Sequence, residues 1–329
     1  MKKMLLMLGV AAAAMTSCTN DEVVEVNPTA SIQFETFVNK GTRATTDVTN
    51  PTITEGIHGS GLKNFFVYGY YGTTSVFDGE EVAWVNKNGN TAGRWTYNRG
   101  THKKWTGGDY YFAAYADDNE AEELSDVEFT EGTLTIPNYQ VSDEKDLVAA
   151  WFHHNNNVLT NPIVDLDFKH MLSKVYFEIK NNASENLIMG ISDIVISVAP
   201  SGTCSYNNGT TVVWNPLANA TSKTFDGSNN VAQGSTHTSK KHFVIPGQTG
   251  IKAAFTATFY NGAGTVIYSK TYENVSLDVT GGWQAGYIYK YTAEVDVVMP
   301  TIEFGVSVTE WDSDLNGDGD LTNDDIPVN

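Results

Sequence analysis

The feature that most constrains the fold of this chain is a two-residue alternation of apolar and polar side chains, repeated in many short segments. In extended backbone successive side chains point to opposite sides, so a strand with one buried face produces this period. The alternation is clearest in residues 287–297, and it recurs in residues 302–308 and 175–180. Two further apolar segments flank Asn-Gly-Ala-Gly at residues 261–264, a sequence that predicts a β-hairpin.

The arrangement of these segments favours an all-β protein. Short strands joined by turns rich in Gly, Asn and Thr are typical of β-sandwiches, and residues 117–125 are the one segment for which we expect a short helix. At 329 residues the chain has room for two domains of about 150 residues each. A polar, turn-rich stretch at residues 153–162 places the division near residue 160, so we expect sandwiches at residues 44–160 and 161–310.

The N-terminus has the layout of a secretory signal peptide. Lys2 and Lys3 precede an apolar run, residues 4–15, that is too short to span a bilayer. The sequence Met-Thr-Ser-Cys at residues 15–18 then resembles a bacterial lipobox. We therefore expect removal of residues 1–17 and acylation of Cys18 with fatty acids such as palmitate, which would anchor the protein in the outer membrane. The alternative is an ordinary signal peptide in which Cys18 is incidental.

Charge and cysteine content exclude several classes of function. The chain carries 39 acidic against 20 basic side chains, a net charge of −19, and such a surface repels nucleic-acid phosphates, so we expect no nucleic-acid partner. Cys204 is the only cysteine besides Cys18. With Cys18 acylated it has no partner for an intramolecular disulfide, and we expect a buried residue without a redox role.

Sequence signatures of catalysis are missing. The chain has no H-E-x-x-H motif, P-loop or nucleophile elbow. His153 and His154, with Asp165 and Asp167 nearby, suggest a metal or acid–base site, but carboxylates are frequent in so acidic a chain. His170 lies inside a predicted strand, where a structural role is the expected one. We therefore expect a protein that is not an enzyme.

Four segments, spread over most of the chain, carry a family resemblance. They are KWTGGDYYFAAY at residues 104–115, LDFKHMLSKV at 166–175, GWQAGYIY at 282–289 and VTEW at 308–311. In this order they resemble the fimbrillin family of Gram-negative surface lipoproteins, which build or decorate type V pili. The resemblance implies two tandem β-sandwich domains of Greek-key or transthyretin-like type at the cell surface. It also implies assembly with other pilus subunits by donor-strand exchange.

The segment between Cys18 and Arg43 contains a candidate for an exchangeable strand. Residues 31–38 alternate as a strand does, and Arg43-Ala44 follows in a polar context that suits proteolysis. In pilus subunits of the family, an arginine-specific protease removes the lipidated N-terminal segment, here residues 18–43, at such a site. The hypothesis is that residues 31–38 fill a groove until this cleavage, after which a neighbour's strand replaces them.

Other roles stay open at this stage. Anchor subunits of such pili keep both the lipid and the N-terminal segment, and that role would leave Arg43 uncut. A different class of protein is a surface lipoprotein that does not polymerise and binds glycans or a host protein through exposed aromatic side chains. A pilus subunit would be processed and polymerise, whereas this second class would remain monomeric.

The C-terminal tail, residues 311–329, contains a candidate calcium loop. Counted from Asp314, oxygen-bearing side chains fall at the positions that coordinate Ca²⁺ in twelve-residue loops, and Gly319 occupies the sixth position, where the chain must turn sharply. Fimbrillin resemblance does not supply this loop, and the alternative is a solvated acidic tail. The candidate Ca²⁺ ligands are Asp314, Asn316, Asp318, Asp320, Thr322 and Asp325.

Overall fold

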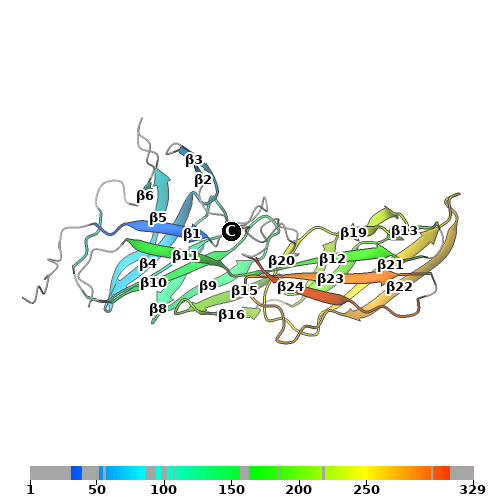
Figure 1. Cartoon of the computed structure of the whole chain (residues 1–329). Coiled ribbons are helices and arrows are strands. Elements are labelled where there is room, and N and C mark those ends of the chain that lie inside the picture. The colour runs from blue at the N-terminus through cyan, green and yellow to red at the C-terminus, as the bar shows by residue number, and fades with distance from the viewer. Residues whose placement is uncertain are drawn as a thin grey trace, which may run out of the picture.

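The fold is built from β-strands alone in the part of the chain that the computed structural model describes, namely residues 31–38, 52–54, 57–85, 94–97, 102–106, 108–155, 163–183, 186–216, 219–297 and 299–311. Within these residues no helix has the length and apolar character needed to cross a bilayer. The strands form an elongated molecule with two bodies (Figure 1). The expected all-β fold with two β-sandwiches is confirmed.

The first sandwich packs a seven-stranded sheet against a four-stranded one. The larger sheet has the order β1 (Phe34–Val38), β11 (Val164–His170), β10 (Val148–His154), β7 (Tyr110–Ala116), β4 (Asn64–Tyr71), β5 (Thr74–Val85) and β6 (Arg94–Thr96). The smaller sheet has the order β16 (Thr211–Pro216), β15 (Ser201–Asn207), β9 (Thr133–Gln140) and β8 (Glu128–Thr130). Side chains from both sheets meet in one hydrophobic core.

The second sandwich has its own core between a five-stranded and a six-stranded sheet. The first of these has the order β19 (Thr236–Thr238), β12 (Ser173–Asn181), β23 (Tyr287–Val295) and β24 (Gly305–Glu310), with β20 (His242–Val244) also paired to β12. The other has the order β17 (Thr221–Phe225), β14 (Ile194–Val198), β21 (Lys252–Tyr260), β13 (Ile188–Ile191) and β18 (Ser228–Val231), with β22 (Val266–Ser276) on β21. A separate small ribbon pairs β2 (Thr52–Thr54) with β3 (Ile57–Ser60).

The two cores do not correspond to a single cut in the sequence. β11 lies after residue 160, yet it pairs with β10 in the first sandwich, Val148 opposite His170. The hairpin β15–β16 comes later still, and β15 pairs with β9 there. We propose two domains, of which the first includes β11 and the β15–β16 hairpin from the second half of the chain.

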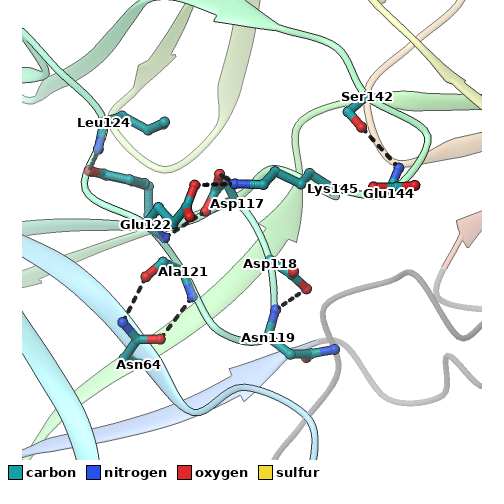
Figure 2. A network of polar contacts seen from close by, with 11 residues as sticks. Asn64, Asp117, Asp118, Asn119, Ala121, Glu122, Leu124, Ser142, Glu144 and Lys145 are labelled. Atoms are coloured by element: carbon teal, nitrogen blue, oxygen red, sulfur yellow. Dashed lines mark hydrogen bonds and ion pairs between the residues drawn. The ribbon is translucent and has the colours of Figure 1, made fainter.

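The expected short helix at residues 117–125 is wrong, because this segment is an irregular loop. Figure 2 shows what replaces helical hydrogen bonds there. The side chain of Asn64 donates to the carbonyl of Ala121 and accepts from its N–H, each over 2.8 Å. The carboxylate of Asp117 accepts from the N–H of Glu122 over 3.0 Å. Contacts with distant residues thus satisfy the backbone, and the acidic residues that suggest a helix start bind other groups.

Candidate functional site

The candidate site is the slot that holds β1 at the edge of the seven-stranded sheet. β1 runs parallel to β11, and the N–H of Val164 donates to the carbonyl of Gln33 over 2.8 Å. On its other side the N–H of Ile32 donates to the carbonyl of Lys103, again over 2.8 Å. The start of the segment is therefore hydrogen-bonded on both sides, through Ile32 to Lys103 and through Gln33 to Val164, whereas β1 itself pairs with β11 as the edge strand.

Side chains of this segment alternate between the core and solvent. Ile32 and Phe34 are 1% and 5% exposed, whereas Gln33 and Glu35 are exposed. The alternation is what the sequence predicts for residues 31–38, of which β1 forms the second half. Because the inward side chains are large and apolar, burying each of them contributes about 1.5–3 kcal/mol to holding the strand in the slot.

Phe34 lies at the centre of an aromatic cluster. Among the described residues, four rings meet it edge to face, an arrangement that adds to the burial of apolar surface. Three of them belong to β4, β5 and β7, so β1 is packed against the middle of the sheet as well as against its edge. The ring centroids lie at 5.4 Å for Phe77, 5.7 Å for Tyr97, 6.0 Å for Phe65 and 6.1 Å for Phe112.

A tyrosine hydroxyl forms hydrogen bonds at the start of the segment 31–38. Tyr97 donates to the carbonyl of Ile32 over 3.0 Å and accepts from the N–H of Lys103 over 3.0 Å. Burial raises the pKa of Tyr97 to about 12, so its hydroxyl stays protonated and able to donate at physiological pH. Sequence reasoning missed this contact, since Tyr97 lies 65 residues from Ile32 and meets only its backbone carbonyl.

Removal of β1 would leave an open groove. The sheet curls so that its two edge strands, β1 and β6, are in contact. β11 turns buried side chains, among them Val164, Leu166 and Phe168, toward the core, and among the described strands its outer edge is paired to β1 alone. Without β1 the backbone groups on the outer edge of β11 would lose their partners and the inward side chains would lose the cover of Phe34, and such an edge accepts another strand.

The processing and metal residues expected from the sequence lie outside the described residues. These are Cys18, Arg43, Ala44 and the candidate calcium loop at residues 314–325. β1 ends at Val38, shortly before Arg43. Among the residues that the structure describes, no group of three or more His, Cys, Asp or Glu side chains could hold a metal ion. The suspected set of His153, His154, Asp165 and Asp167 is therefore not brought together as a metal site.

His170 has the structural role expected for it. Its Nδ1 lies 2.8 Å from Oδ2 of Asp146, and both side chains are fully buried. The imidazole stacks on the ring of Trp311 with centroids 4.1 Å apart and planes 7° from parallel. This contact joins two of the four family-like segments. Cys204 is buried with a free thiol, as expected, and burial raises the pKa of that thiol.

Comparisons with known proteins agree with this architecture. A family model described as fimbrillin-like matches residues 42–311, a range that begins after β1. A fimbrial protein from Bacteroides vulgatus has a similar solved structure, with a TM-score of 0.58 and 13% identity over 85% of this chain and 99% of that one. A protein from Bacteroides uniformis, described as a cell adhesion protein, gives a TM-score of 0.51 and 17% identity over 86% and 98%. A comparison with curated protein sequences gives no match.

The two solved structures support the fold, and the family model supports the relationship suggested by the four sequence segments. Its match extends through both sandwiches and ends at Trp311, the last of those segments. The chain therefore belongs to the fimbrillin-like family.

Proposed function

We propose that the protein is a subunit of a type V fimbria, exported as a lipoprotein precursor to the cell surface and assembled by donor-strand exchange. The observation that carries this proposal is β1. This strand precedes the residues matched by the family model, yet it completes the first sandwich through parallel pairing with β11 and through the buried ring of Phe34. A segment that is removed during assembly would be expected to lie outside the residues that the family model matches, as β1 does.

Proteolysis would convert this strand from a covalent part of the chain into a separate peptide. In the precursor, the link through residues 39–51 keeps the effective concentration of β1 at its slot high. Hydrolysis between Arg43 and Ala44 by an arginine-specific protease would remove that link. A strand from another subunit, with apolar residues in the places of Ile32 and Phe34, would then compete for the slot and pair with β11.

The lipid at Cys18 would hold the precursor at the outer membrane until cleavage. After cleavage the lipid would remain with residues 18–43, and the processed subunit would be retained by its neighbours in the fibre. In this scheme the partners are the protease and other pilus subunits, and each subunit contacts the next through backbone pairing in the slot of β1.

Limited proteolysis of the purified full chain tests the proposal. Treatment with an arginine-specific protease should give a first cut between Arg43 and Ala44, followed by multimers that survive denaturant. Arg43→Ala should stay intact and monomeric, while Arg94→Ala, at the next arginine along the chain, should be cut and should polymerise like the wild type. Resistance at Arg43 would favour an anchor, and a protein that is cut at Arg43 and remains monomeric would contradict exchange and leave a surface lipoprotein that does not polymerise.

We also propose that residues 314–325 bind Ca²⁺, supported by the spacing of their oxygen-bearing side chains. Isothermal titration of the full chain with Ca²⁺ should give a binding signal that Asp318→Ala abolishes. Asp312→Ala, just outside the loop, is the matched control and should leave binding unchanged. Equal binding by the Asp318→Ala protein would rule out this loop as the site.

A further inference from the structure

A cavity of about 490 Å³ lies at the end of the first sandwich farthest from the second core. Its size is within the range of small-molecule sites, about 300–1,000 Å³. The tips of three hairpins surround it: β4–β5, β8–β9 and β15–β16, at the lower end of the first body in Figure 1. The lining includes Tyr70, Tyr111, Phe129, Thr130, Glu131 and Asn208.

One wall of the cavity is aromatic. Tyr70 of β4 and Tyr111 of β7 are directly opposite in an antiparallel pair, so their side chains lie on the same face of the sheet. The ring of Phe129 lies 5.7 Å from that of Tyr70. The imidazole of His153 backs the ring of Tyr111, with centroids 4.3 Å apart and planes 7° from parallel. The wall is therefore a supported aromatic surface and not a set of loose side chains.

The opposite wall is polar and comes from turns. Thr130 is the last residue of β8, Glu131 belongs to the β8–β9 turn, and Asn208 belongs to the β15–β16 turn. These residues are exposed, and none of the hydrogen bonds within the described residues uses the side chain of Glu131 or Asn208. Together they offer a carboxylate, an amide and a hydroxyl, which include both donors and acceptors, to a ligand in the cavity.

The two polar turns are fixed to each other. The N–H of Asn208 donates to the carbonyl of Gly132 over 2.9 Å, and the hydroxyl of Tyr206 donates to the carbonyl of Gly209 over 2.8 Å. Gly132 has φ +80°, and a Cβ atom there would lie 2.1 Å from the Asn208 side-chain oxygen. Because the turns are already ordered, a ligand would not have to immobilise them, and binding would lose little entropy.

This combination of groups identifies the class of ligand. A pyranose sugar has an apolar C–H face, which packs on an aromatic ring, and hydroxyls around its edge, which pair with carboxylate and amide groups. The carboxylate of Glu131 and the net charge of −19 disfavour anionic sugars. We propose that this cavity is a binding site for neutral glycans.

The proposed site is independent of the slot that holds β1. Phe34 packs on Phe65 and Phe112, whose side chains point to the face of the larger sheet opposite to that of Tyr70 and Tyr111. Glycan binding therefore does not require cleavage or strand exchange, and it can be measured on the uncut chain. Failure of strand exchange would leave the measurement unaffected.

The test uses the uncut full chain in a detergent without a sugar headgroup. The probes are polyacrylamide conjugates that carry β-galactose, α-mannose, β-N-acetylglucosamine or α-sialic acid, immobilised for interferometry. We expect binding to at least one neutral conjugate and none to sialic acid. Tyr111→Ala should weaken that binding at least about tenfold, and Glu131→Gln should weaken it as well, because the amide accepts sugar hydroxyls less strongly than a carboxylate does.

Two variants separate loss of the site from loss of the fold. Tyr111→Phe keeps the ring and should retain binding within about threefold. Tyr71→Ala removes the next tyrosine of β4, whose side chain points to the other face, and should bind as the wild type does. The proposal is overturned if no neutral conjugate binds, if sialic acid binds equally well, or if Tyr111→Ala binds as tightly as Tyr71→Ala.

Discussion

At the scale of single residues, Asp143 connects the two bodies of the molecule. It lies in the loop after β9, and its carboxylate is 2.7 Å from Nδ1 of His242 and 2.8 Å from Nζ of Lys223. It also accepts from the N–H of Phe243 over 3.2 Å. Burial alone would raise the pKa of Asp143, but the hydrogen bonds and charges of His242 and Lys223 outweigh it and lower the pKa to about 2.

This shift predicts an acid-sensitive contribution to stability. A carboxylate with a depressed pKa stabilises the fold above its ordinary value, 3.8, and loses that effect as the pH falls toward about 2. Asp143→Asn should therefore lower the free energy of unfolding at neutral pH, and the difference from the wild type should shrink between these two pH values. Urea unfolding of both proteins at a series of pH values measures this difference in the free energy of unfolding. Glu144→Gln, at the exposed neighbouring residue, controls for the lost charge, and a difference that stays constant down to pH 2 would contradict the assignment.

Phe34 should dominate the attachment of β1. Truncation of a buried Phe in a packed cluster costs about 3–5 kcal/mol, because apolar burial is lost and a cavity remains. Phe34→Ala should lower the free energy of unfolding by about that amount, measured by urea denaturation of the uncut protein. Glu35→Ala, one residue along on the exposed side of the strand, should change it by less than about 0.5 kcal/mol. Equal effects of the two substitutions would mean that Phe34 does not hold β1.

At the scale of strands, what could be predicted from the sequence is local. The residue 261–264 turn is correctly predicted, because Asn261 itself fixes it by accepting from the N–H groups of Ala263 and Thr265. The alternation at residues 287–297 corresponds to β23. At residues 302–308 the strand starts only at Gly305, since Ile302 and Phe304 pack into the second core before β24 begins.

Pairing between distant strands could not be predicted in this way. The parallel pairing of β1 with β11 and the pairing of β15 with β9 join segments far apart in the sequence, and no local pattern specifies either. The same holds for the candidate site. Alternation at residues 31–38 identified the occupant of the slot, but the slot is made by distant residues. β11 pairs with β1, and Tyr97 and Lys103 hydrogen-bond to backbone atoms of Ile32, just before that strand.

β1 should bind as a separate strand when the protein has been cut and its own segment removed. A labelled synthetic peptide with the sequence of residues 30–39 should bind this processed protein, because the strand carries its pairing groups and its inward side chains with it. Fluorescence anisotropy measures the affinity. The same peptide with Phe34→Asp should bind much more weakly, since it would bury a charge in the slot, whereas Glu35→Gln should have little effect. Equal binding of all three peptides would contradict specific occupancy of the slot.

At the scale of the whole molecule, one tryptophan links the two cores. Trp311 follows β24, a strand of the second sandwich, but its ring is fully buried with the side chains of the first core. It stacks on His170, and its ring lies 5.5 Å from that of Phe243 and 4.2 Å from Nζ of Lys174. The backbone N–H of Trp311 donates to the carbonyl of Gly286 over 2.8 Å. The end of β24 is thus packed against both sandwiches.

Such a shared residue should couple the unfolding of the two bodies. If the second sandwich unfolds, Trp311 leaves the first core, which then loses a buried aromatic side chain worth about 3–5 kcal/mol. The wild type should therefore unfold in one calorimetric transition, and Trp311→Ala should give two, because the sandwiches can then open separately. Val308→Ala, at an exposed residue of the same strand, should retain one transition. Two transitions in the wild type would show that the two bodies are not coupled. One transition in Trp311→Ala would show that the coupling runs through other contacts, of which the Asp143 ion pairs with Lys223 and His242 are the first to test.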